Sequence, residues 1–281
     1  MNRILFGLML LALSAQTQAQ TYQQNVRAAL DALAQDSLTL AEGLLRKALT
    51  QEPALKSNAI LFQHLGRIQE RRGQQTEALE SYSMGLNLSP TTLGLLLDRA
   101  SLYLRRGDEK HALADYDDVL NLSADHQEAL FFRAYIYTRQ RLYKQARADY
   151  EHLIRLRPDH VEARMALALL NDRDNRPREA MEQITSLIEL YPNRADLYLA
   201  RGGMEQDRKQ YETALHDMNR ALELNPKNPD AYLSRAALYM SMKRKKLAKQ
   251  DCHTAISLGA DRETALRILV ECDDERASAA A

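Results

Sequence analysis

The sequence predicts an all-α protein, an α-solenoid of stacked helix–turn–helix repeats with a C-terminal capping helix. A unit of 34 residues recurs without a gap through most of the chain. Within each unit, apolar residues form two stripes at helical spacing, separated by a short polar turn. Only 10 glycines and 7 prolines occur in 281 residues, which suits helices rather than sheets. An array of this kind is one continuous structure and not a set of independent domains.

The chain begins with the features of a secretory signal peptide, which we predict over residues 1–19. Arg3 precedes an apolar run over residues 4–14, and a small–x–small site predicts cleavage after Ala19. The alternative is a membrane anchor, but this run is well short of the roughly 20 residues that span a bilayer. No cysteine follows the run, so the lipobox of a lipoprotein is absent. We expect export to the periplasm or cell envelope of a bacterium, with no integral membrane segment in the mature chain.

The repeats are defined by a few positions, counted from the first residue of each unit. Position 8, on the first helix, is small in six copies: Gly66, Ala100, Ala134, Ala168, Gly202 and Ala236. Position 20, on the second helix, is always alanine: Ala78, Ala112, Ala146, Ala180, Ala214 and Ala248. Small residues there let the two helices approach closely. Position 24 is larger in most copies, as in Tyr82, and fills the space against the next unit. Proline at position 32 of four copies ends the second helix, because it lacks an amide proton.

This pattern resembles the tetratricopeptide repeat family, in about seven copies that include a weaker first one around Ala29 and Ala41. The resemblance implies a right-handed superhelix over residues 20–262. Its repeats are expected at about 22–55, 59–92, 93–126, 127–160, 161–194, 195–228 and 229–262. The large residue usual at position 4 is only partly kept, and Arg164 departs from it. We therefore expect the repeat at 161–194 to pack more loosely.

A capping helix is predicted over residues 263–273, with Ala265, Leu266, Leu269 and Cys272 on one face. Such a helix covers the exposed edge of the last hairpin, as solenoids require. Residues 274–281 lack apolar periodicity and are predicted to form a flexible tail.

Arginine at position 7 and aspartate at position 23 occur together in four copies and are both missing from the other three. The pairs are Arg99 with Asp115, Arg133 with Asp149, Arg201 with Asp217, and Arg235 with Asp251. This covariation within one chain predicts structural ion pairs between first and second helices, either within a copy or across to its neighbour. A bidentate guanidinium–carboxylate contact has the geometry to set helix register.

The resemblance places the binding groove on the first helices, at positions that include 5, 9 and 13. The candidate groove residues are Arg67, Arg71, Arg105, Phe131, Tyr135, Arg139, Met165 and Arg173. Four of them form a series of arginines at position 13 in successive copies, which suits an acidic peptide or a terminal carboxylate. The alternative is that arginine near a helix C-terminus complements the helix dipole, worth roughly 0.3–1 kcal/mol each. Both interpretations remain open at this point.

No catalytic constellation is visible in the sequence. The seven histidines are not at metal-ligand spacing with a second histidine or cysteine on one helix, and there is no phosphate-binding glycine loop or nucleophile elbow. The 38 basic and 38 acidic side chains balance, which argues against general nucleic-acid binding. Cys252 and Cys272 either form a disulfide in an oxidising compartment or remain free, with Cys252 buried and Cys272 half-exposed. We expect no metal, no cofactor and no enzymatic activity.

We expect an exported scaffold for protein–protein interaction through its concave groove, with a role in envelope assembly or secretion by analogy. The partner would be a protein or peptide with acidic character. The alternative is a periplasmic chaperone-like holder of client proteins, suggested by the apolar groove residues. A cell-wall hydrolase is less favoured, because no acid, base or nucleophile converge.

Overall fold

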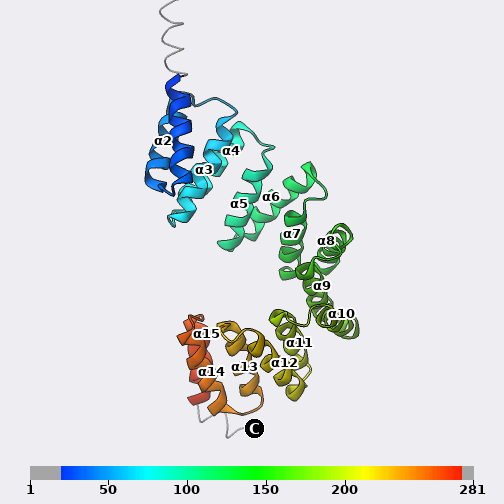
Figure 1. Cartoon of the computed structure of the whole chain (residues 1–281). Coiled ribbons are helices and arrows are strands. Elements are labelled where there is room, and N and C mark those ends of the chain that lie inside the picture. Colours follow the sequence, from blue (N-terminus) through cyan, green and yellow to red (C-terminus); the bar gives the residue numbers. More distant parts are fainter. Residues whose placement is uncertain (1–19, 274–281) are drawn as a thin grey trace, which may run out of the picture. The chain divides into compact units, whose positions relative to one another are not determined.

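The structure, a computed structural model, describes residues 20–273, and these are helical apart from the turns between helices. No strand occurs within that range, so the all-α prediction is confirmed. The signal peptide expected at 1–19 and the tail expected at 274–281 lie outside the described residues. The helices follow one another as antiparallel pairs (Figure 1).

The described helices belong to two compact units, divided after Ile136. The first unit contains a helix over residues 20–34, α2 (Leu38–Gln51), α3 (Asn58–Arg71), α4 (Gln75–Leu88), α5 (Leu93–Arg105), α6 (Glu109–Leu122) and most of α7 (Gln127–Arg139). The second contains α8 (Tyr143–Leu156), α9 (Val161–Arg173), α10 (Pro177–Leu190), α11 (Ala195–Asp207), α12 (Tyr211–Leu224), α13 (Pro229–Ser241), α14 (Lys245–Ser257) and α15 (Arg262–Asp273).

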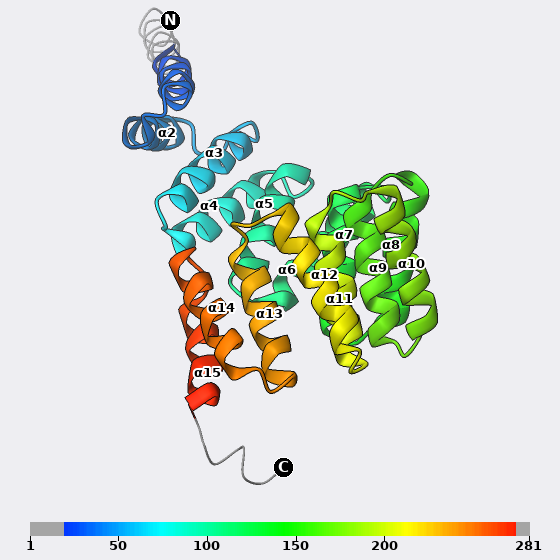
Figure 2. The same cartoon turned by 60° about the horizontal axis from the view of Figure 1, so that its bottom comes forward.

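Helix pairs of one repeat pack closely, and within each unit neighbouring pairs pack against each other. In the first unit α3 pairs with α4 and α5 with α6; in the second α9 pairs with α10, α11 with α12 and α13 with α14. First helices also contact first helices: α3 meets α5, and α11 meets both α9 and α13. The succession of α11, α12 and α13 can be followed in Figure 2. Within each unit the first helices therefore share a face.

The predicted small positions lie in the core. The alanines at position 20 are fully buried, and so are Tyr82 and Tyr116 at position 24. Gly66 lies so close to Tyr82 that an added Cβ would come within 2.3 Å of the ring. The contact between first and second helices thus depends on side-chain size at a few positions, since cores are close-packed.

Position 15, in the turn between the helices of a repeat, adopts a left-handed backbone in all seven copies. The residues are Asp36, Gly73, Gly107, Arg141, Asn175, Lys209 and Lys243, with φ from 58° to 78°. A left-handed residue after a helix is a common way to end it. Glycine adopts this conformation without cost, whereas arginine and lysine do not. The left-handed backbone of this turn therefore sets the position from which the Arg141 side chain extends.

The C-terminal helix α15 packs on α14 and α13. Ala265, Ile268 and Cys272 are buried in a cluster with Leu233 and Cys252, as a cap requires. The expectation that Leu266 lies on the buried face is wrong, because 47% of it is exposed. Ile268 lies on the buried face instead. It is three residues after Ala265 and four before Cys272, and residues at these spacings share a helix face, whereas Leu266 directly follows Ala265.

Candidate functional site

In the first unit, three arginines of the predicted groove are exposed, but each is paired with an acidic residue of a neighbouring repeat. Arg67 donates from Nε to Asp98 at 2.7 Å and from Nη2 at 3.1 Å. Hydrogen bonding to this carboxylate raises the pKa of Arg67. The three pairs are Arg67–Asp98, Arg71–Asp36 and Arg105–Glu70. The position-13 series in this unit is therefore largely neutralised.

These pairs were not expected from the sequence. Exposed pairs of this kind contribute about 0–1 kcal/mol to stability, so their main effect is on the charge of the face. The signal that could have revealed them is the position of the acid. Glu70 occupies position 12 of the copy that precedes Arg105, and therefore lies one repeat away on the same helix face.

The apolar groove candidates differ in their exposure. Phe131 is half-buried and packs edge-on against Phe132, with ring centroids 5.4 Å apart. Tyr135 is 42% exposed. In the second unit, Met165 is half-buried and packs against the core. Of these three side chains, only Tyr135 offers a large apolar surface to a partner.

In the second unit, Arg139 and Arg173 line a pocket of about 490 Å³ together with Thr138, Arg141 and Tyr143. Three arginines and two residues with hydroxyl groups thus line one space. None of the described residues that line it is acidic. Arg141 and the two hydroxyl residues were not among the sequence candidates, because a turn residue reaches this pocket only through the geometry of the turn.

The acids nearest to this pocket in sequence are engaged elsewhere. Asp172 pairs with Arg208, and Asp174 accepts from Arg147 at 2.6 Å. At position 12 of the preceding repeat, where Arg105 finds Glu70, Arg173 has Thr138. The pocket, which we call the arginine pocket, therefore has three arginines and no acidic residue among the described residues that line it.

The arginine and aspartate of the repeated pair lie together in three copies, within one repeat. Arg99 donates from Nε and Nη2 to Asp115 at 2.9 and 2.7 Å. The equivalent distances are 2.6 and 2.9 Å for Arg201 and Asp217, and 2.7 and 2.8 Å for Arg235 and Asp251. The pairing of Arg133 with Asp149 stays a prediction. Each of the three contacts is bidentate and joins the first helix to the second.

The same arginines also reach the preceding repeat. Nη1 of Arg99 donates to Ser83 at 3.0 Å, and Nη1 of Arg133 donates to Asp117 at 2.8 Å. Nη1 of Arg235 donates to Asn219 at 2.7 Å. All three acceptors occupy position 25. One arginine therefore links three helices of two repeats, a role that position 7 alone did not reveal.

Two of the copies that lack the pair use amides instead. The side chains of Gln69 and Ser81 lie 2.7 Å apart, and Asn171 donates to Gln183 at 2.8 Å. These contacts join position 11 to position 23. The sequence signal is that position 11 carries an amide only in these two of the six aligned copies.

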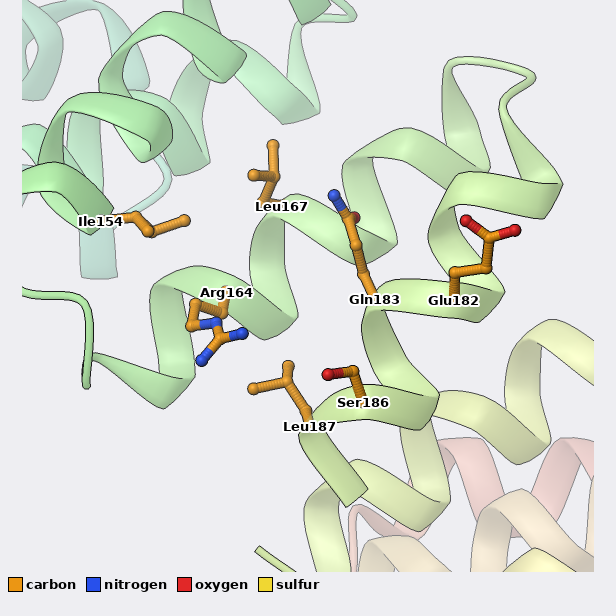
Figure 3. Close-up of a pocket in the computed structure, with 7 residues that line it drawn as sticks. All are labelled: Ile154, Arg164, Leu167, Glu182, Gln183, Ser186 and Leu187. Atoms are coloured by element: carbon orange, nitrogen blue, oxygen red, sulfur yellow. The ribbon is translucent and has the colours of Figure 1, made fainter. Parts of the chain in front are cut away.

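A hollow of about 380 Å³ lies in one of these repeats, between α8, α9 and α10 (Figure 3). Arg164 lines it on one side and Glu182 on another, with Leu167 and Leu187 between them. Arg164, which replaces a large apolar residue at position 4, is among the residues that line this hollow. The looser packing expected for this repeat stays a prediction.

Both cysteines are free thiols in the structure. Cys252 is fully buried, and burial raises the pKa of its thiol to about 11. Cys272 is buried too, rather than half-exposed, and its Sγ lies 3.1 Å from the sulfur of Met240. Both thiols are therefore poorly reactive, because the thiolate is the reactive form.

Within residues 20–273, no group of three or more His, Cys, Asp or Glu side chains is placed to hold a metal ion. No helix in the same range is both long and apolar enough to cross a membrane.

Comparison with known proteins agrees with this architecture. Two family models match, one described as TPR repeat over residues 204–243 and one as Tetratricopeptide repeat over residues 139–195. A tetratricopeptide repeat protein from Parabacteroides merdae is 28% identical, with 90% of this chain and 99% of that chain covered and a TM-score of 0.83. The chain is a tetratricopeptide repeat protein. Proteins of this family generally act as non-catalytic scaffolds for protein–protein interaction.

More distant structures share the fold of this tetratricopeptide repeat protein. MamA from Desulfovibrio magneticus is 22% identical, covering 60% of this chain and 95% of that one, with a TM-score of 0.54. Yeast Tom70 is 15% identical, covering 92% of this chain and 64% of that one, with a TM-score of 0.58. No curated protein matches the sequence.

Proposed function

We propose that this tetratricopeptide repeat protein is an exported, non-enzymatic scaffold that binds an acidic segment of a partner protein in the arginine pocket. Export rests on the N-terminal sequence, which has the charged start, short apolar run and small–x–small site of a signal peptide. We place the protein in the periplasm or envelope of a bacterium.

The observation that carries this proposal is the convergence of Arg139, Arg141 and Arg173 in a pocket without an acidic wall. A guanidinium can hold a carboxylate by two parallel hydrogen bonds, which makes arginine suited to this ligand. Thr138 and Tyr143, which carry hydroxyl groups, line the same space.

The test is binding of a fluorescein-labelled acidic hexapeptide, measured by fluorescence anisotropy at 50 and 200 mM salt. The Arg141→Glu/Arg173→Glu variant should lose at least tenfold in affinity, because two attractive contacts become repulsive. Arg155→Glu is the matched control, an exposed arginine on α8 that does not line the pocket, and should stay within twofold. Unchanged binding by the double variant would refute the site.

Export is tested separately, by fractionating cells and sequencing the N-terminus of the mature protein. A mature chain that begins at Gln20 and is found outside the cytoplasm is expected. A cytoplasmic protein with an intact N-terminus would refute export while leaving the binding site to the peptide assay. Suppression of the aggregation of many unrelated clients, without preference for the acidic peptide, would favour a chaperone-like holder instead.

A further inference from the structure

Two hollows occupy corresponding positions in the two repeats that have amides in place of the arginine–aspartate pair. One, of about 400 Å³, is lined by residues of α2, α3 and α4, and we call it the α3–α4 hollow. The other is the hollow of α8, α9 and α10 shown in Figure 3. They share leucine at position 7, a branched aliphatic residue at position 28 of the preceding repeat, and glutamate at position 22. These residues are Leu65 and Leu167, Leu49 and Ile154, and Glu80 and Glu182.

In the sister repeats, an arginine side chain extends from position 7 toward positions 23 and 25. Arg99 leaves α5, contacts Asp115 on α6, and reaches Ser83 on α4. In the α3–α4 repeat the residues at positions 7 and 23 are Leu65 and Ser81, and both line the hollow. Leucine is shorter than arginine and carries no guanidinium. The hollow therefore lies where its sisters hold the side chain of their own arginine.

The charge around the α3–α4 hollow suits a cation. Glu77 and Glu80 both line it. Position 22 carries glutamate only in the two hollow repeats, and the other aligned copies have Ala114, Ala148, His216 and Gln250. Arg46 is the only basic residue among those that line this hollow, and it donates to Glu42 at 2.8 and 3.1 Å. The lining thus contains two glutamates and one arginine, and that arginine already pairs with Glu42.

The hollow of Figure 3 has a different charge. Arg164 occupies position 4 there, where the α3–α4 hollow has Phe62, and its guanidinium lies across the pocket from Glu182. One arginine and one glutamate thus line this hollow, whereas one arginine and two glutamates line the α3–α4 hollow. Of the two hollows, the α3–α4 hollow therefore has the charge that better suits a basic side chain.

We propose that the α3–α4 hollow binds an arginine side chain presented by an extended segment of a partner protein. The aliphatic stem of the incoming arginine packs on Leu65 and Leu49, and its guanidinium approaches Glu80. The partner would supply from outside the side chain that Arg99 supplies within the next repeat. This surface is opposite in charge to the arginine pocket, so it goes beyond the proposed binding of an acidic segment.

The test uses acetyl-Gly-Ala-Arg-Ala-Gly-amide as the probe and the methyl resonances of methionine as the readout. Met84 lines the hollow and is 52% exposed, so its methyl group should report binding directly. The peptide should cause a saturable shift of this resonance in the full-length protein. Peptides with norleucine or glutamate in place of arginine should bind at least fivefold more weakly, because they lack the guanidinium.

Two variants separate the hollow from a general acidic surface. Glu80→Ala, which copies Ala114 of the sister repeat, should weaken the arginine peptide about fivefold. Glu128→Ala, an exposed glutamate on α7 that does not line the hollow, should leave its affinity unchanged. Leu65→Arg/Ser81→Asp recreates the pair of the sister repeats and should abolish binding by filling the hollow.

The proposal is overturned if the norleucine peptide binds as well as the arginine peptide, or if Glu80→Ala has no effect. It is also overturned if the folded Leu65→Arg/Ser81→Asp variant still binds. Should that double variant fail to fold, the peptide comparison and Glu80→Ala still decide the matter.

Discussion

Replacing Arg99 by leucine removes the guanidinium from a carboxylate that is almost completely buried. Asp115 is 3% exposed and accepts two hydrogen bonds from Arg99, at 2.9 and 2.7 Å. Breaking a buried ion pair by removing one partner costs about 3–5 kcal/mol, because the other charge is left without compensation. The substitution also removes the hydrogen bond from Arg99 to Ser83 on the preceding repeat. We expect Arg99→Leu to lower the free energy of unfolding by about 3 kcal/mol or more.

The double variant Arg99→Leu/Asp115→Ser should cost less than Arg99→Leu alone. It copies Leu65 and Ser81 of the α3–α4 repeat, and it leaves no buried charge. The side chain of Arg99 is 21% exposed, so in Asp115→Ser it can still be solvated and the cost should be smaller. The four proteins form a double-mutant cycle, with a coupling energy of about 1–3 kcal/mol expected.

The assay is urea unfolding followed by circular dichroism, with hydrogen exchange of the amides of α5 and α6 as a local readout. The local measurement is needed because repeat arrays can unfold in sections. Arg106→Leu is the control, an exposed arginine beside the end of α5, and should change stability by less than about 0.5 kcal/mol. If the costs of the two single variants sum to the cost of the double variant, the coupling energy is zero and the expected ion-pair energy is refuted.

The same cycle has a pH dependence with a definite sign. Burial raises the pKa of the Asp115 carboxyl, and the hydrogen bonds from Arg99 oppose this effect. Without Arg99 the folded-state pKa should rise further above the unfolded value. The protonated carboxyl then fits the folded state, and stability is lost as the pH rises through the folded-state pKa. The defect of Arg99→Leu should therefore be smaller at pH 5 than at pH 8.

Two other predictions concern the core. Burial raises the pKa of Cys252 to about 11 and raises that of Cys272 too, so both thiols should react slowly with Ellman's reagent at pH 8 in the folded protein. After unfolding without reductant, two thiols should be counted. A count of zero would show a disulfide. Gly66→Ala should cost about 1–3 kcal/mol in the free energy of unfolding, because the new Cβ would meet the ring of Tyr82 at 2.3 Å. Gly203→Ala, with no atom within 4 Å of the new Cβ, is its control, and equal melting temperatures for the two variants would refute the clash.

Comparison of copies alone would judge Gly66→Ala harmless. Three of the six aligned copies pair alanine or glycine at position 8 with tyrosine at position 24, and in the copy with Ala100 and Tyr116 both residues are fully buried. In the α3–α4 repeat, a Cβ on residue 66 would meet the ring of Tyr82 at 2.3 Å. Such a contact depends on how each pair of helices packs, which no single position encodes.

In the candidate site too, the sequence identified some residues and only the structure identified the others. Position 13 identified Arg139 and Arg173, because a fixed period repeats the same place on successive helices. Arg141 reaches their pocket from a turn whose backbone is left-handed, and its place there depends on that turn. Position 13 alone did not reveal that Arg105 is matched by Glu70, because the acid lies one repeat away, at position 12 of the preceding copy.

The amino-acid sequence by itself determined the helices, their pairing into hairpins and the repeat, because these depend on the spacing of apolar and small residues along short stretches of chain. It also indicated which arginines and aspartates belong together, since seven copies of one unit can be compared. Only the tertiary structure decided which charges are cancelled and which converge, that the pair closes within a repeat, and where the missing arginines leave hollows. Those outcomes depend on the distances between side chains of different helices, and such distances are set when the repeats pack together.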